Sequence, residues 1–115
     1  DEDNAITVST SALGVDDNES IPNQFALHQN YPNPFNPSTQ ISFDIPEGGE
    51  YIMLNIYNIL GQNVSTLVNG VMNPGRYTMD WNATDEIGNP VASGIYFYEL
   101  RSESFTARKK MLLIR

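Results

Sequence analysis

The sequence predicts an all-β fold, an Ig-like antiparallel sandwich of about seven strands preceded by an extended linker. From Phe25 onward, segments of β-branched and aromatic residues recur at close spacing, with glycine, proline and asparagine between them. Several of these segments alternate between apolar and polar residues, as strands with one buried face do. A chain of 115 residues that is 40% hydrophobic can also build one modest core. This rhythm favours strands over helices.

Residues 1–22 are predicted to be an acidic linker or the tail of a preceding domain, before a single domain that covers residues 23–115. The linker lacks apolar periodicity and holds six of the fourteen acidic residues. Within it, residues 5–10 are of β type and could instead form the last strand of a preceding domain or an added edge strand. The start is neither basic nor apolar, as a signal peptide would be, so we expect the chain to be part of a longer protein.

A proline tract leads into the second predicted strand. Residues 30–41 read Asn-Tyr-Pro-Asn-Pro-Phe-Asn-Pro-Ser-Thr-Gln-Ile, with three prolines among asparagines. Each proline fixes its own φ and pushes the residue before it, here Tyr31, Asn33 or Asn36, toward extended geometry. The pattern predicts a rigid, straight approach to the strand and not an active site.

The predicted strands lie at residues 25–28, 39–45, 50–58, 63–68, 76–82, 94–102 and 105–114. In the second, Ile41, Phe43 and Ile45 face one way and the residues between them are polar. The third has an apolar face of Ile52, Leu54 and Ile56. Its other face is partly covered by Tyr51, Met53 and Tyr57, which predicts a central strand or a covered outer face.

The later strands carry the clearest core pattern. In the fifth, Tyr77, Met79 and Trp81 alternate with polar residues, and Trp81 is the expected core anchor. In the sixth, Tyr96 and Tyr98 share one face with Leu100. The predicted structural core contains Ile41, Phe43, Leu54, Ile56, Trp81, Tyr96 and Tyr98.

Charge and composition exclude several classes of function. The net charge is −8, and residues 1–75 contain nine acidic residues and no Lys or Arg, whereas residues 76–115 contain all six basic ones. An acidic body argues against nucleic acid as a partner. The absence of cysteine excludes disulfides and thiolate metal sites. The sequence contains no run of about 20 apolar residues, which a membrane-spanning helix would need.

Catalytic and metal-binding residues are poorly represented. The only histidine, His28, lies beside the linker, and no nucleophile and base can be paired with it, so we expect no enzyme activity. The acidic and amide residues between Asp80 and Asn89 surround Gly88 and could bind calcium weakly. The alternative is a plain turn in which Asp and Asn bond their own backbone. We otherwise expect no cofactor.

Three dispersed motifs resemble one known family. Residues 31–39, followed by Ile-Ser-Phe-Asp-Ile-Pro at 41–46, resemble the start of the type A C-terminal sorting domains of type IX (Por) secretion substrates. Residues 56–64 resemble that family's "Tyr-Asp/Asn-x-x-Gly-x-x-Val" hairpin. Residues 88–98 resemble its "Gly-x-x-Val-x-x-Gly-x-Tyr" motif, before a basic last strand at 108–113. The pattern is shared with the Ig-like domain of the flagellar hook-capping protein.

The resemblance implies a sorting signal that directs a cargo protein, carried on the N-terminal side, through an outer-membrane translocon. The cargo would travel via the periplasm of a Gram-negative bacterium to the cell surface or medium, and a sortase-type peptidase would act on the domain. We expect cleavage within residues 9–22. The recognition residues implied are Asn33, Pro34, Gly94, Tyr96, Lys109, Lys110, Met111 and Leu113.

Three alternatives remain open at the level of sequence. Gly94 and Tyr96 also suit a purely structural role at the start of a strand. The lysines of the last strand could protect an exposed edge from aggregation, or form part of a strand that a receptor adds to a sheet. The whole domain could instead be a structural or adhesive module of an extracellular protein, which would gain support if Tyr51, Tyr57 and Phe97 formed one outer platform.

Overall fold

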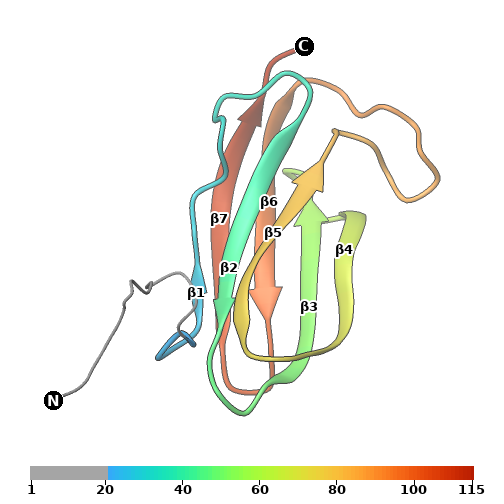
Figure 1. Ribbon diagram of the computed structural model, residues 1–115. Helices are drawn as coiled ribbons and strands as arrows, with labels where there is room; N and C mark the ends of the chain where they lie inside the picture. The colour runs from blue at the N-terminus through green and yellow to red at the C-terminus, as the bar shows by residue number, and fades with distance from the viewer. Residues whose placement is uncertain (1–20) are drawn as a thin grey trace, which may run out of the picture.

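The computed structural model describes residues 21–115, which form two antiparallel β-sheets packed face to face (Figure 1). One sheet has the order β1-β2-β5 and contains β1 (Ala26–Leu27), β2 (Thr39–Ile45) and β5 (Gly75–Trp81). The other has the order β4-β3-β6-β7 and contains β3 (Glu50–Tyr57), β4 (Asn63–Met72), β6 (Gly94–Arg101) and β7 (Thr106–Leu113). The predicted all-β, Ig-like sandwich of seven strands is confirmed.

Residues 1–20, and with them the predicted linker, the alternative strand at 5–10 and most of the expected cleavage region, lie outside the described residues. Within residues 21–115 every element is a strand. None of these residues forms a helix long and apolar enough to cross a membrane.

Strand β4 is longer than the sequence predicted. The prediction ended at Val68, whereas the strand continues to Met72 through Asn69 and Gly70. Both residues have weak local preference for strands. They are extended because β3 pairs with them in regular register, with Glu50 opposite Met72 and Leu54 opposite Val68.

The core lies between the inner faces of the two sheets. Pairing of β2 with β5 sets Ile41 opposite Met79 and Phe43 opposite Tyr77. The seven residues assigned to the core from the sequence are all at most 7% exposed. Further buried side chains come from the proline tract and the last strand: Phe35, Met111 and Leu113.

Trp81 stands at the centre of an aromatic group. Its ring centroid lies 5.9 Å from that of Phe35 and 5.5 Å from that of Tyr96, and its indole N–H donates to the carbonyl of Thr84 at 2.9 Å. These neighbours come from the proline tract, from β6 and from the loop after β5, so one side chain joins three separate parts of the chain.

We expect Trp81→Ala to lower the free energy of unfolding by about 3–5 kcal/mol, because it leaves a cavity and removes an aromatic contact surface. Urea unfolding followed by circular dichroism measures the loss. Trp81→Phe serves as the matched control and should cost less, because it retains a ring beside Phe35 and Tyr96. A loss below about 1 kcal/mol for Trp81→Ala would contradict the central role of this residue.

Candidate recognition surface

The proline tract covers the outer edge of β7 (Figure 1). The Phe35 N–H donates to the Leu112 carbonyl at 3.0 Å, and the Ile114 N–H donates to the Phe35 carbonyl at 2.9 Å. The Leu112 N–H donates to the Asn33 side-chain oxygen at 3.0 Å, and the Gln29 amide donates to the Lys110 carbonyl at 2.9 Å. A strand could be added to residues 110–114 only if the tract were displaced.

A buried polar joint holds the tract in this place. The Tyr98 hydroxyl accepts from the Asn30 N–H at 2.8 Å and donates to the His28 carbonyl at 2.7 Å. The Asn30 side chain donates to the Thr39 hydroxyl, which donates to the Pro32 carbonyl, at 2.9 Å each. Burial raises the pKa of the Tyr98 hydroxyl to about 12, although the Asn30 N–H favours its charged form.

The residues predicted to mediate recognition divide into an exposed and a buried group. Asn33, Pro34 and Lys110 are exposed along the joined edge of the tract and β7. Lys109 is half-buried on the opposite side of the strand. Gly94 begins β6 opposite Leu113, with φ 148°. The other three side chains lie in the core and are at most 7% exposed: Tyr96, Met111 and Leu113.

A shallow cavity marks the exposed group. It has a volume of about 220 Å³ and is lined by Asn33, Ile95, Lys110, Met111 and Leu112. Ile95 and Leu112 are cross-strand partners, and both are more than a third exposed. The cavity therefore combines an apolar floor with an ammonium group and an amide at its rim, which suits an apolar side chain next to a carboxylate or a carbonyl.

An arginine and two aromatic rings continue this surface across the sheet. The Arg108 guanidinium lies 5.4 Å from the ring centroid of Tyr57 and 5.9 Å from that of Phe97. It also pairs with the Glu99 carboxylate at 3.3 Å, and Arg101 pairs with the same carboxylate at 3.2 Å. Glu99 is only 5% exposed. Two arginines compensate this buried charge and are held in place by it.

No sequence pattern predicted that Arg108 would lie against these two rings. Tyr57, Phe97 and Arg108 lie on the same face of three strands, and only the order β3-β6-β7 brings them together. Tyr57 is opposite Phe97, whereas Tyr51 stands at the other end of β3 and donates to Asn69 at 2.6 Å. The three aromatic residues therefore do not form a single platform.

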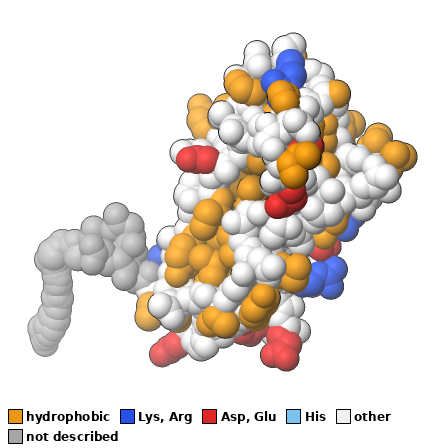
Figure 2. Space-filling view, turned by 90° about the vertical axis from the view of Figure 1, so that its right-hand side faces the viewer, with side chains coloured by type: hydrophobic (Ala, Val, Ile, Leu, Met, Phe, Trp, Pro, Cys, Tyr) orange, Lys and Arg blue, Asp and Glu red, His pale blue; other side chains and the backbone are white. Residues whose placement is uncertain are grey.

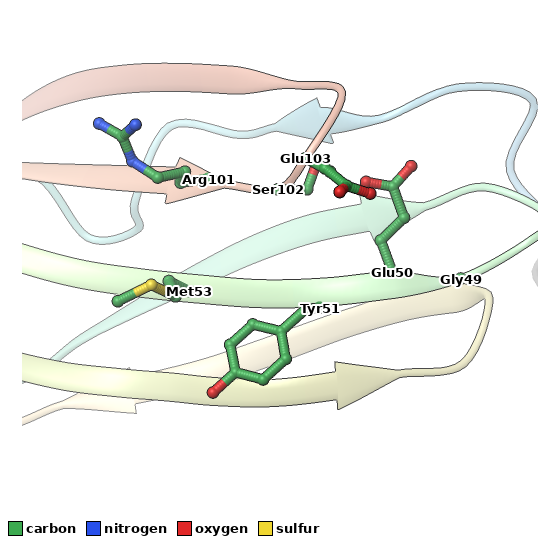
Figure 3. A pocket seen from close by; sticks show the side chains of 7 residues that line it. All are labelled: Gly49, Glu50, Tyr51, Met53, Arg101, Ser102 and Glu103. Atoms are coloured by element: carbon green, nitrogen blue, oxygen red, sulfur yellow. The ribbon is translucent and has the colours of Figure 1, made fainter.

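A second cavity lies near Tyr51. It has a volume of about 410 Å³ and is lined by Gly49, Glu50, Tyr51, Met53, Arg101, Ser102 and Glu103. Figure 3 shows that the Tyr51 ring and the Arg101 guanidinium point away from each other. The Ser104 hydroxyl donates to Glu50 at 2.7 Å and lowers the pKa of its carboxyl. Most polar groups here already have partners within the protein.

The remaining candidates have local partners as well. The imidazole of His28 lies 3.2 Å from the Asp44 carboxylate. In the loop after β5, the Asp85 carboxylate accepts from the N–H groups of Ile87 and Asn89, at 3.1 and 2.9 Å. The Glu86 carboxylate accepts from the Thr66 N–H. In residues 21–115, no three His, Asp or Glu side chains are grouped to hold a metal ion.

The same loop is attached to the end of the chain. The Arg115 guanidinium donates to the Val91 carbonyl at 2.7 Å and to the Ala83 carbonyl at 2.9 Å. The Arg115 N–H donates to the Ser93 hydroxyl at 2.9 Å. These bonds fix the loop against the strand that carries the recognition surface.

Comparison with known proteins gives a matching family model and several similar solved structures. The family model of the FlgD Ig-like domain matches residues 30–104. The structure of PorZ from Porphyromonas gingivalis, an essential bacterial surface component of the type IX secretion system, matches with 22% identity and a TM-score of 0.55. Dimeric latent PorU from the same organism matches with 18% identity and a TM-score of 0.62.

These matches cover 77% and 95% of this chain, but only 11% and 10% of PorZ and PorU. The chain therefore spans about a tenth of either protein, and at this identity the likeness shows a shared fold. No curated protein matches the sequence. The resemblance drawn from the sequence motifs to the Ig-like domain of the hook-capping protein is confirmed by the family match.

We expect Tyr98→Phe to lower the free energy of unfolding by about 1–3 kcal/mol, because the Asn30 N–H and the His28 carbonyl lose a buried partner. The free energy of unfolding of the variant should also fall less at high pH than that of the parent. The pKa of Tyr98 is 10.0 when unperturbed and about 12 in the folded protein. The unfolded chain therefore loses this proton first, and stability falls between those two pH values.

Urea titrations of both proteins at pH 8, 10 and 11.5 measure the difference. The decline from pH 10 upward should be steeper in the parent than in Tyr98→Phe, since the other tyrosines and lysines are common to both. Parallel declines would show that the Tyr98 hydroxyl is not held in its neutral form.

Proposed function

The chain belongs to the family of FlgD Ig-like domains, and from this premise we propose that it is a non-catalytic sorting domain for type IX secretion. It would direct a cargo protein, carried on its N-terminal side, through the outer-membrane translocon to the cell surface or medium. The fold that it shares with domains of PorZ and PorU is consistent with this role.

One observation carries the proposal. The first sequence motif and the basic last strand meet at the hydrogen bond between the Asn33 side chain and the Leu112 N–H, which joins residues 79 positions apart. Asn33 of the first motif and Lys110 and Leu112 of the last strand border the same cavity. A receptor that binds at this cavity would contact the first motif and the last strand together, and the two segments are adjacent only in the folded domain.

The surface also has the chemistry of a docking site. Lys110 and Arg108 add positive charge to a molecule whose net charge is −8. The exposed side chains of Ile95 and Leu112 supply apolar area beside Lys110. A partner with an acidic rim around an aliphatic contact would complement this surface, with charge guiding the approach and apolar contact holding the complex.

The family resemblance implies that a sortase-type peptidase removes the sorting domain from its cargo protein. We propose the same here, within residues 9–22. Pro22 is buried. Cleavage before Pro22 would leave the sandwich intact.

An export assay tests the sorting role. A periplasm-targeted fluorescent protein is fused to residues 9–115 in a host that has the type IX system, and fluorescence outside the cell is compared with that in the periplasm. Deleting the last strand is a poor control, because Met111 and Leu113 belong to the core. Lys110→Ala with Leu112→Ser changes only exposed side chains of the surface, and Arg76→Ala removes one positive charge from the other sheet.

We expect the parent fusion and Arg76→Ala to be exported. The double variant Lys110→Ala/Leu112→Ser should show at least a severalfold loss of export at an unchanged melting temperature. If the folded parent fusion stays in the periplasm, the sorting role is wrong for that host, and a structural or adhesive module retained in an extracellular protein is the better reading. If the double variant is exported normally, the domain sorts through another surface.

A further inference from the structure

The edges of the four-stranded sheet differ in how they are protected. The β7 edge is closed by the proline tract along residues 110–114 and carries Arg108, Lys109 and Lys110. The opposite edge is β4, and among the described residues its backbone–backbone hydrogen bonds all go to β3. On its free side, the Thr66 N–H donates to the Glu86 carboxylate.

The open part of β4 is its second half, Val68 to Met72. Register shifts interrupt the pairing with β3 at Leu67 and at Val64, and such bulges twist an edge away from partners. From Val68 to Met72 the register is regular. Val71 is 78% exposed, and Tyr51, its neighbour on β3, is 54% exposed.

None of the usual protections of an edge strand is present there. Natural sheets block exposed edges with lysine, with proline or with a covering segment. Residues 51–75, which include all of β4 and all of β3 except Glu50, contain no Asp, Glu, Lys, Arg or His. Figure 2 looks onto this side of the molecule and shows hydrophobic side chains gathered on its lower half, with acidic ones at the lower margin and near the middle of the face.

We propose that this stretch of β4 is a pairing edge that binds the same stretch of a second copy of the chain. Two copies would lie antiparallel about a two-fold axis and join their four-stranded sheets into one. Because β4 contains no charged residue, two molecules of net charge −8 can pair along it without placing like charges on the paired strands. This inference does not depend on the sorting function.

The side chains permit such an approach. Gly70 lies in the middle of the stretch, and a Cβ built on it would meet no atom within 4 Å. Pairing about this residue would bring Val71 of one copy beside Asn69 of the other and would cover part of both exposed Tyr51 rings. The contact is small, so we expect a weak dimer that forms in the range of about 0.1–1 mM.

Sedimentation equilibrium of the whole chain tests the proposal. The apparent mass should rise from 12.9 kDa toward twice that value with concentration. It should also rise between about 0.02 M and about 0.5 M salt, because salt screens the repulsion between two acidic molecules. A dimer held by the basic β7 against acidic groups would weaken with salt instead.

Two kinds of variant locate the contact. Val71→Lys should weaken dimerisation at least tenfold, whereas Leu60→Lys, equally exposed at 78% in the turn before β4, should not. The chain has no cysteine, so Gly70→Cys gives a single thiol that should form disulfide-linked dimers on mild oxidation. Thr106→Cys, on β7, should do so much more slowly.

A chain that stays monomeric to about 1 mM at both salt concentrations would overturn the proposal. So would a dimer that Val71→Lys leaves intact, or one that Leu60→Lys disrupts equally. A melting temperature close to that of the parent for each variant confirms that the comparison is made between folded molecules.

Discussion

The Tyr98 hydroxyl is the contact on which the arrangement of the recognition surface depends. It joins β6, in one sheet, to the backbone of residues 28 and 30. From that joint the proline tract runs along β7, so that Asn33 and Phe35 reach the backbone of Leu112. A buried hydroxyl with both partners satisfied is costly to leave unpaired, and the tract is therefore held in one position.

The strands could be predicted from the sequence because alternation is a local property of the chain. The order of the strands could not, and the contacts between sheets and along edges depend on it. Tyr57, Phe97 and Arg108 each appear as an outward residue of a separate strand, and nothing in the sequence indicates that Arg108 lies against the two rings. The length of β4 was missed for the same reason, since pairing with β3 overrides the weak strand preference of Asn69 and Gly70.

The motifs behind the family resemblance combine two kinds of residue that sequence alone does not separate. Tyr96, Met111 and Leu113 fill the core, whereas Asn33 and Lys110 are exposed beside a cavity. A recurring residue can mark a fold as well as a site. The exposed neighbours Ile95 and Leu112 lie between the motif residues on the surface and were not singled out, because an apolar residue facing outward has no pattern of its own.

The closure of β7 by the proline tract has a consequence for assembly. A sheet with two open edges can add copies at both ends and grow without limit, as amyloid does. Here the four-stranded sheet has a free stretch on β4, and on its other side the chain itself occupies residues 110–114 of β7. Association through β4 therefore joins two molecules, and the covered part of β7 offers no edge to which a third could add.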